Sequence, residues 1–334
     1  MKFWQNKYLK IFGLVVLGFG AGFWFSRTGK VQSGELNLDG LTPIKAAQTE
    51  YDLIQPLLGY RIPKSVGEAE YADFIAKTNH LIDNAKKQGG LIKASVYLRD
   101  LTDNHWAGIA EQDKYEPASL LKVVVMMVYL KKSETDPGLL KKELLYNQKD
   151  PVKDFDSESN LVYGNKYSVD ELISDMIINS DNGALNTLLD SSDGREIQNF
   201  YNLLNLPDYG GAGSDYTIST QTYSLFFRIL FNATYLNYAD SEKALKLLSQ
   251  AKFDKGLKAG LPSGVTVAHK FGEHVVGQGG QVTEAGLHDC GIIYYPEHPY
   301  LLCVMTLGKE WEPLTKLVGQ ISQTAYDAIK NKTN

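Results

Sequence analysis

Short apolar or alternating stretches, bounded by turn residues, lie towards both ends of the globular part of the chain and predict five β-strands. The predicted strands are residues 92–100, 105–110, 265–272, 281–295 and 300–307. Only a short turn at 102–104 separates the first two strands, so we expect them to form a β-hairpin. A turn at 296–299 joins the last two strands in the same way.

Between and beyond these strands, apolar residues recur at helical spacing. They predict helices over 67–88, 118–132 and 312–331, and a mostly helical middle from about 139 to 250. Strands at both ends with helices between them favour one sheet built from both ends, with the helical middle packed as a second lobe. The expected fold class is therefore α/β, of the α+β type.

The first thirty residues have a different pattern from the rest. An uncharged run, 11–26, follows three lysines and ends at Arg27. This run is short of the roughly 20 residues that a membrane span needs, but Trp4 and Trp24 lie where interfacial aromatic residues are expected. We expect residues 1–30 to form a single-pass N-terminal anchor in the cell membrane, with a cleaved signal peptide as the alternative. Either one exports the rest of the chain.

Composition narrows the function classes. The chain has 334 residues, of which 43% are hydrophobic and 22% charged, which is ordinary for a globular protein with a large core. Its net charge of −5 shows no basic footprint, so we expect no nucleic-acid partner. No spacing of the two cysteines and six histidines matches a zinc site, so we expect no metal and no other cofactor.

Ser119 and Lys122 are the first candidates for chemistry. Pro117 and Ala118 lead into a strongly helical run, which places Ser119 at a helix N-terminus and Lys122 one turn later on the same face. The helix dipole favours negative charge there, and a lysine in an apolar site can act as a base. The alternative is a capping serine beside a solvated lysine, and a second S-x-x-K at 249–252 shows that this spacing alone is weak.

Two further motifs carry polar groups suited to the same site. Ser180, Asp181 and Asn182 form an S-D-N sequence at the end of a helical pattern, where a plain helix cap and turn is the alternative. The strand ending in Lys270-Phe271-Gly272 offers a cation for a substrate carboxylate and a glycine that allows close backbone approach. A solvated strand lysine is the alternative there.

The order S-x-x-K, S-D-N, K-x-G is the set typical of class A β-lactamases and penicillin-binding proteins. Over about residues 90–330 the chain resembles class A β-lactamase-like serine hydrolases, the penicillin-recognising serine enzymes of the β-lactamase and D,D-peptidase superfamily. The 61-residue separation of Ser119 and Ser180 fits that family. Gly260-Leu-Pro before the K-x-G strand and His288-Asp-Cys on the next strand resemble its pattern too.

The resemblance implies roles for these residues. Ser119 would be the acylated nucleophile, Lys122 its general base, and Ser180 the proton relay to the leaving nitrogen. The expected substrate-binding residues are Asn182, Lys270, Gly272 and Glu273. Backbone N–H groups of Ser119 and Glu273 would form the oxyanion hole.

The resemblance also implies a β-lactamase/transpeptidase-like fold, with a five-stranded antiparallel sheet flanked by helices and an all-α lobe. We expect a linker and lead-in at 31–65 and a catalytic domain at 66–334, with its helical lobe at about 135–255. The implied partner is a small-molecule β-lactam or a peptidoglycan peptide. The sequence leaves the oligomeric state open.

The chain departs from the family in two places. No Glu-x-x-Leu-Asn follows the S-D-N motif, so the glutamate that positions the deacylating water is missing. Asp208 and Asp215 are the only acids in the expected loop, while Glu196 has the pattern of a helix residue. Phe271 replaces the hydroxyl residue of the K-[ST]-G motif, and Glu273 places an acid beside the oxyanion site.

These departures leave three functions open. The first is an extracytoplasmic serine hydrolase that acylates on a β-lactam or a cell-wall peptide. The second is a penicillin-binding D,D-peptidase-like enzyme with slow deacylation. The third is a non-catalytic peptidoglycan-binding module, although retention of all four polar motif residues disfavours it.

The remaining histidines and cysteines show no catalytic pattern. We expect His269, His274 and His288 to be surface or core residues. Cys290 and Cys303 lie on neighbouring predicted strands and on the same face, but the turn between them makes them diagonal. We therefore expect two buried thiols, with a disulfide as the alternative.

Overall fold

The computed structural model describes residues 42–45, 51–61, 68–149, 159–192, 194–207, 216–278 and 281–333. The predicted anchor at 1–30 lies outside these residues. Gly40–Asn334 forms one compact unit. Among the helices within the described ranges, none combines the length and the apolar character needed to cross a membrane.

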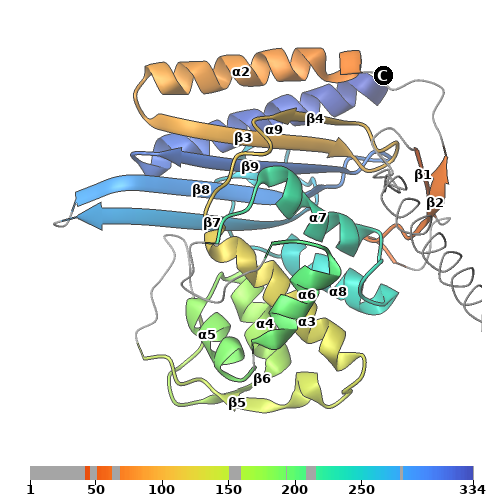
Figure 1. Ribbon diagram of the computed structural model, residues 1–334, viewed down its shortest axis with the longest axis vertical. Coiled ribbons are helices and arrows are strands. Elements are labelled where there is room, and N and C mark those ends of the chain that lie inside the picture. The colour runs from red at the N-terminus through yellow and green to blue at the C-terminus, as the bar shows by residue number, and fades with distance from the viewer. Residues whose placement is uncertain are drawn as a thin grey trace, which may run out of the picture. The chain divides into compact units, whose positions relative to one another are not determined.

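A five-stranded antiparallel sheet occupies the middle of this unit, in the order β4-β3-β9-β8-β7 (Figure 1). Its strands are β3 (Leu91–Asp100), β4 (Trp106–Ile109), β7 (Val267–Gln278), β8 (Gln281–Ile293) and β9 (Tyr300–Gly308). The five predicted strands and the expected sheet are therefore confirmed. The two ends of the sequence pair directly, because β3 lies beside β9.

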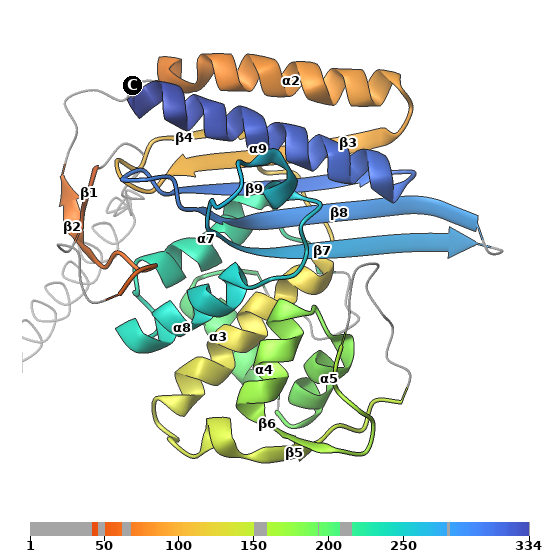
Figure 2. The ribbon, with the colours of Figure 1, turned by 180° about the vertical axis from the view of Figure 1, so that it is seen from behind.

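Helices cover both faces of the sheet. On one face lie α2 (Ala72–Lys87), preceded by the short turn η1 (Glu68–Tyr71), and α9 (Trp311–Thr333) (Figure 2). The helices of the opposite lobe are α3 (Leu121–Ser133), α4 (Val169–Ile178), α5 (Asn182–Asp190), α6 (Arg195–Leu203), α7 (Thr220–Phe231) and α8 (Tyr238–Ser249). Short 3-10 turns are η2 (Ala118–Leu120), η3 (Leu139–Lys141) and η4 (Leu257–Gly260). The α+β architecture with its helical lobe is confirmed.

Alternation along the strands divides the interior into two apolar cores. On β3, Tyr97 packs towards the helical lobe, whereas Leu98 packs towards α2 and α9. Successive strand residues point to opposite faces, and both faces of this sheet are covered. This explains why β3 is buried continuously from Ala94 to Asp100 and why β9 is both apolar and buried along almost its whole length.

Two small sheets were not predicted. They pair β1 (Thr42–Lys45) with β2 (Leu57–Arg61), and β5 (Glu143–Leu145) with β6 (Lys166–Ser168).

Residues 52–54, between β1 and β2, are held by a residue that is distant in sequence. Buried Glu242 on α8 accepts hydrogen bonds from the backbone N–H groups of Asp52, Leu53 and Ile54 at 3.1, 2.9 and 3.0 Å. Three donors on one carboxylate hold this lead-in against the domain.

Cys290 and Cys303 form a disulfide, so the prediction of two free thiols is wrong. The reason is register: β8 and β9 place the two cysteines directly opposite each other, not diagonally. Directly opposed residues on antiparallel strands point to the same face with their Cβ atoms close together. Lys270 is the partner of Cys290 on the next strand, so the disulfide lies beside Lys270 on the same face.

Removing this disulfide is expected to lower the free energy of unfolding by about 3 kcal/mol, because it closes a short loop in the unfolded chain. The two cysteines are 13 residues apart. Denaturant unfolding of a Cys290→Ser/Cys303→Ser double variant measures the loss. Wild-type protein unfolded with a reductant is the matched comparison, since it keeps both sulfur atoms. Equal unfolding free energies with and without reductant would contradict the prediction.

Candidate active site

Ser119 lies at the junction of the sheet and the helical lobe. It belongs to η2, which continues into α3, and its side chain is only slightly exposed. Ala118, immediately before it, has a φ of +48°, a left-handed conformation that is unfavourable for a residue with a Cβ atom. Such backbone strain is concentrated at functional sites, where the surroundings hold it in place.

Lys122 lies one turn later and is completely buried. Its helix is apolar around its whole circumference from Val123 to Leu130, because α3 runs through the middle of the lobe. An ammonium or amine group in this environment requires polar partners within reach. The Nζ atom of Lys122 donates hydrogen bonds to Ser180 O at 2.7 Å and to Ser180 Oγ at 3.0 Å.

The turn between α4 and α5 presents Ser180. A capping box formed by Ser168 and Glu171 fixes the start of α4, and Asp181 caps the start of α5. Between the two helices, Ser180 is completely buried and has a φ of +56°. Like Ala118, it is a non-glycine residue in the left-handed region.

Lys270 reaches the same hydroxyl from the edge strand β7. Its Nζ atom donates to Ser180 Oγ at 2.8 Å and to Phe271 O at 2.8 Å, and its side chain is completely buried. Two lysine amines that are distant in sequence thus meet on one serine. A hydroxyl has two acceptor lone pairs and one donor. With both lone pairs used by Lys122 and Lys270, the O–H of Ser180 must donate to a third atom.

Gly272 allows β7 to approach the nucleophile. A Cβ atom at this position would lie 2.9 Å from Pro117 O and 3.1 Å from Leu120 N, which is too close for a side chain. The next residue, Glu273, is partly buried at this edge. The close approach seen at Gly272 is that of residues 117–120, whereas the sequence predicted an approach of the substrate's backbone, which stays a prediction.

The ring of Phe271 is buried and stacks on Phe253, with ring centroids 4.0 Å apart. The Nζ atom of Lys270 lies 4.2 Å from the centroid of the same ring. The residue that follows Lys270 therefore contributes a π face and no hydroxyl group. A cation over an aromatic face is stabilised by the ring quadrupole.

His288 holds the segment that leads to Ser119. Its Nε2 atom bonds Glu116 O at 2.9 Å, and Thr306 N donates to its Nδ1 atom at 3.3 Å. Burial lowers the pKa of His288 to about 4, so the ring is neutral at pH 7. His288 was predicted to be a surface or core histidine, and it is a core residue. The sequence alone could not predict its hydrogen bonds with Glu116 and Thr306.

The structure places the other predicted residues as follows. Asn182 is the first residue of α5, directly after Asp181. Glu196 lies in α6, as predicted, and pairs with Lys132 at 2.8 Å. Asp208 and Asp215, the two candidate loop acids, lie outside the described residues.

Sequence reasoning missed Asp175, a buried residue of α4 that contacts the Ser180 turn. Burial raises the pKa of its carboxyl, although hydrogen bonds from Asn179 and Ser159 oppose this rise. Asp175 precedes the S-D-N motif by a helical turn and has no motif of its own. An acid on the apolar second half of a helical pattern was the only available signal.

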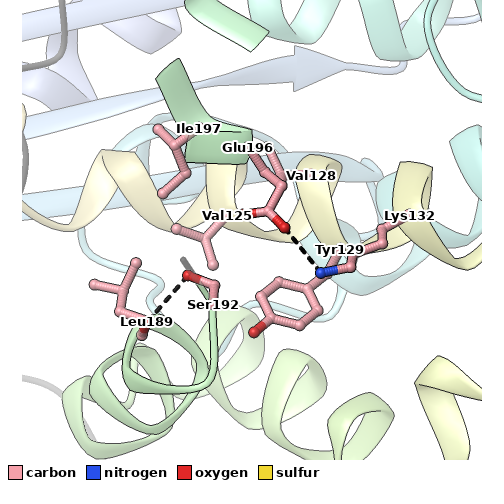
Figure 3. A pocket seen from close by; sticks show the side chains of 8 residues that line it. All are labelled: Val125, Val128, Tyr129, Lys132, Leu189, Ser192, Glu196 and Ile197. Carbon is pink, nitrogen blue, oxygen red and sulfur yellow. Dashed lines mark hydrogen bonds and ion pairs between the residues drawn. The ribbon is translucent and has the colours of Figure 1, made fainter. Parts of the chain in front are cut away.

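A cavity further along α3 is too small to hold a substrate. It has a volume of about 10 Å³, roughly the space of one water molecule (Figure 3). Its walls include Val125 and Tyr129 of α3 and Ile197 of α6. The candidate catalytic groups are not among its lining residues.

One group of side chains has the composition of a metal site. Ligand atoms of Glu70, Asp103 and His105 lie within 4.8 Å of one another. The ammonium of Lys332 is ion-paired with Glu70 at 2.6 Å and with Asp103, and it already supplies positive charge to these carboxylates. This group lies at the C-terminal end of α9 through its ion pairs with Lys332, and we assign it a structural role.

Solved structures of low sequence identity share this fold. PBP-A is 18% identical, with 78% of this chain and 97% of that chain covered and a TM-score of 0.65. A beta-lactamase from Chitinophaga pinensis is 17% identical, with 77% and 99% covered and a TM-score of 0.66. A PBP-A mutant solved as an acyl-enzyme complex with penicillin G is 18% identical, with 77% and 97% covered and a TM-score of 0.64.

Comparisons by sequence give the family. No curated protein matches the chain significantly. The family model described as the beta-lactamase enzyme family matches residues 74–329, which is most of the chain and includes every candidate site residue. The chain therefore belongs to the beta-lactamase enzyme family.

Proposed function

We propose that this protein is an active-site serine hydrolase that is acylated on Ser119 by a β-lactam or by a related cell-wall peptide. The observation that carries this proposal is the convergence of Lys122 and Lys270 on Ser180 Oγ. A solvated surface cluster would not keep all three side chains fully buried. Buried polar groups are retained where they are satisfied or functional.

The count of N–H bonds and lone pairs on Lys122 supports its role as the general base. A neutral lysine amine has two N–H bonds and one lone pair, so it can donate to Ser180 O and Ser180 Oγ and still act as a base. The lone pair then accepts the proton of Ser119 Oγ as this oxygen attacks the carbonyl carbon. Two amines on one hydroxyl disfavour each other's charged form, which helps to keep Lys122 neutral.

The tetrahedral intermediate collapses as the amide C–N bond breaks. Ser180 gives its O–H proton to the leaving nitrogen and is reprotonated by Lys122, so the proton taken from Ser119 ends on the leaving group. Backbone N–H groups of Ser119 and Glu273 stabilise the oxyanion. Lys270, Asn182 and Gly272 bind the substrate along the edge of β7. Water then hydrolyses the ester on Ser119.

The likeness to PBP-A, one mutant of which was solved with a penicillin G adduct, supports a β-lactam as an acyl donor. Phe271 in place of a hydroxyl residue supports weaker recognition of the β-lactam carboxylate. The sequence has no Glu-x-x-Leu-Asn after the S-D-N motif to position a deacylating water. We therefore propose slow deacylation, with a D-alanyl-D-alanine peptide as the physiological type of substrate. A non-catalytic peptidoglycan binder remains an outcome of the test below.

We also propose an extracytoplasmic location, with residues 1–30 as membrane anchor. The buried Cys290–Cys303 disulfide supports this, because disulfides persist mainly in oxidising compartments. The lysines before the uncharged N-terminal run support an orientation with the N-terminus inside the cell.

Turnover assays on the full-length protein distinguish the possible functions, with Ser119→Ala as control. Wild type and variant are incubated separately with a penicillin and with a D-alanyl-D-alanine peptide, and the products are quantified. Release of D-alanine by wild type alone supports the peptidase, and rapid penicillin hydrolysis supports a β-lactamase. Binding of the peptide by both proteins, with no product from either substrate, would contradict the enzyme and favour the binder.

A further inference from the structure

A buried carboxylate holds the turn that carries Ser180. Asp175 is 9% exposed and lies one turn before the end of α4. Its Oδ1 atom accepts a hydrogen bond from Asn179 Nδ2 at 2.5 Å, and its Oδ2 atom accepts one from Ser159 Oγ at 3.0 Å. A buried carboxylate with a donor on each oxygen fixes the groups that it binds.

The main chain of Asp175 adds two more contacts to the same turn. Its carbonyl oxygen accepts hydrogen bonds from Asn179 N at 3.0 Å and from Asp181 N at 3.4 Å. Asp175 is therefore bonded to the residue before Ser180 and to the residue after it. The residues on either side of Ser180, Asn179 and Asp181, are thus both hydrogen-bonded to Asp175.

These hydrogen bonds matter because Ser180 does not hold its conformation by itself. Its φ of +56° lies in the left-handed region, which a serine leaves readily unless its surroundings prevent it. Rotation out of this region would move Ser180 O and Oγ together. Lys122 would lose both of its acceptors on Ser180, and Lys270 would lose one.

We propose that Asp175 is a positioning residue of the candidate active site, whose carboxylate fixes the Ser180 turn and, through it, the amines of Lys122 and Lys270. Its kinetic consequence rests on the proposed function. Its effect on the positions of the two amines does not depend on that function, because contacts within the substrate-free protein set these positions.

Asp175→Asn in the full-length protein removes the charge and keeps the shape. We expect acylation by penicillin to be about tenfold slower, the effect of losing one charge-assisted hydrogen bond. We also expect the side-chain NMR resonances of Lys122 and Lys270 to shift without substrate, and Asp175→Glu to recover part of the rate. Asp170→Asn is the matched control, since Asp170 lies on the same helix, is 43% exposed and pairs with Lys243.

The two readouts separate the possible failures. Shifted lysine resonances in Asp175→Asn, with no acylation of wild type, would support the positioning role and contradict the proposed function. Wild-type acylation with unchanged rate and resonances in Asp175→Asn would overturn the positioning role. Equal losses in Asp175→Asn and Asp170→Asn would overturn it too, because they would show a general effect of charge on α4.

Discussion

Replacement of Lys122 by methionine is expected to slow the acylation of Ser119 by about 10³-fold, because it removes the group that takes the serine proton. Methionine fills much of the same buried volume without a charge or a polar atom that needs partners. A buried amine is costly to maintain, so we expect the Lys122→Met protein to be as stable as wild type or more stable. Rapid mixing with a penicillin, followed by intact-protein mass spectrometry, measures the rate.

Lys131→Met is the control for this experiment. Lys131 lies on the same helix, but its side chain is 42% exposed and pairs with Glu134 at 2.7 Å. Its removal is expected to change the acylation rate by less than about twofold, as is usual for an exposed ion pair. Similar rates for Lys122→Met and wild type would contradict the assignment of Lys122 as the base. A loss that appears equally in both variants would contradict it as well.

The second large effect is a loss of stability in mild acid. Burial lowers the pKa of His288 to about 4, against about 6.5 in an unfolded chain. Between these pH values the unfolded chain binds a proton that the folded chain does not. The free energy of unfolding therefore decreases as the pH falls from 6.5 to 4, by about 3 kcal/mol for this group.

His288→Gln is expected to flatten this part of the stability curve. Glutamine can still donate a hydrogen bond to Glu116 O, but it does not titrate. Denaturant unfolding at several pH values between 4 and 7 measures the slope. His80→Gln, at an exposed position of α2, is the control and should keep the wild-type slope. An unchanged slope in His288→Gln would show that another group controls acid stability.

The sequence predicted the elements that are defined by their own residues. The strands of the sheet are apolar over several consecutive positions, and the helices from α2 to α9 repeat apolar residues at helical spacing. The S-x-x-K, S-D-N and K-x-G motifs also supplied Lys122, Ser180 and Lys270, which meet in the structure. Their meeting at Ser180 depends on the whole fold, yet each motif is short and recognisable by itself.

Other features depend on partners that are distant in sequence. The lead-in at 52–54 is held by Glu242, so no local pattern could predict its position. The disulfide depends on the register of β8 and β9, which a turn of uncertain length leaves open. Asp175 and His288 are ordinary residues in their own elements, and only the tertiary contacts of the Ser180 turn and of the Glu116 segment give them their roles.

The most direct test of the central claim is the site of acylation. Full-length protein is mixed with a penicillin, its intact mass is followed over time, and the modified peptide is then identified by proteolysis and mass spectrometry. We predict a single penicilloyl adduct on Ser119 that persists for minutes or longer and is absent from Ser119→Ala. An adduct on another residue, or none on wild type while a D-alanyl-D-alanine peptide is also left uncleaved, would contradict the account.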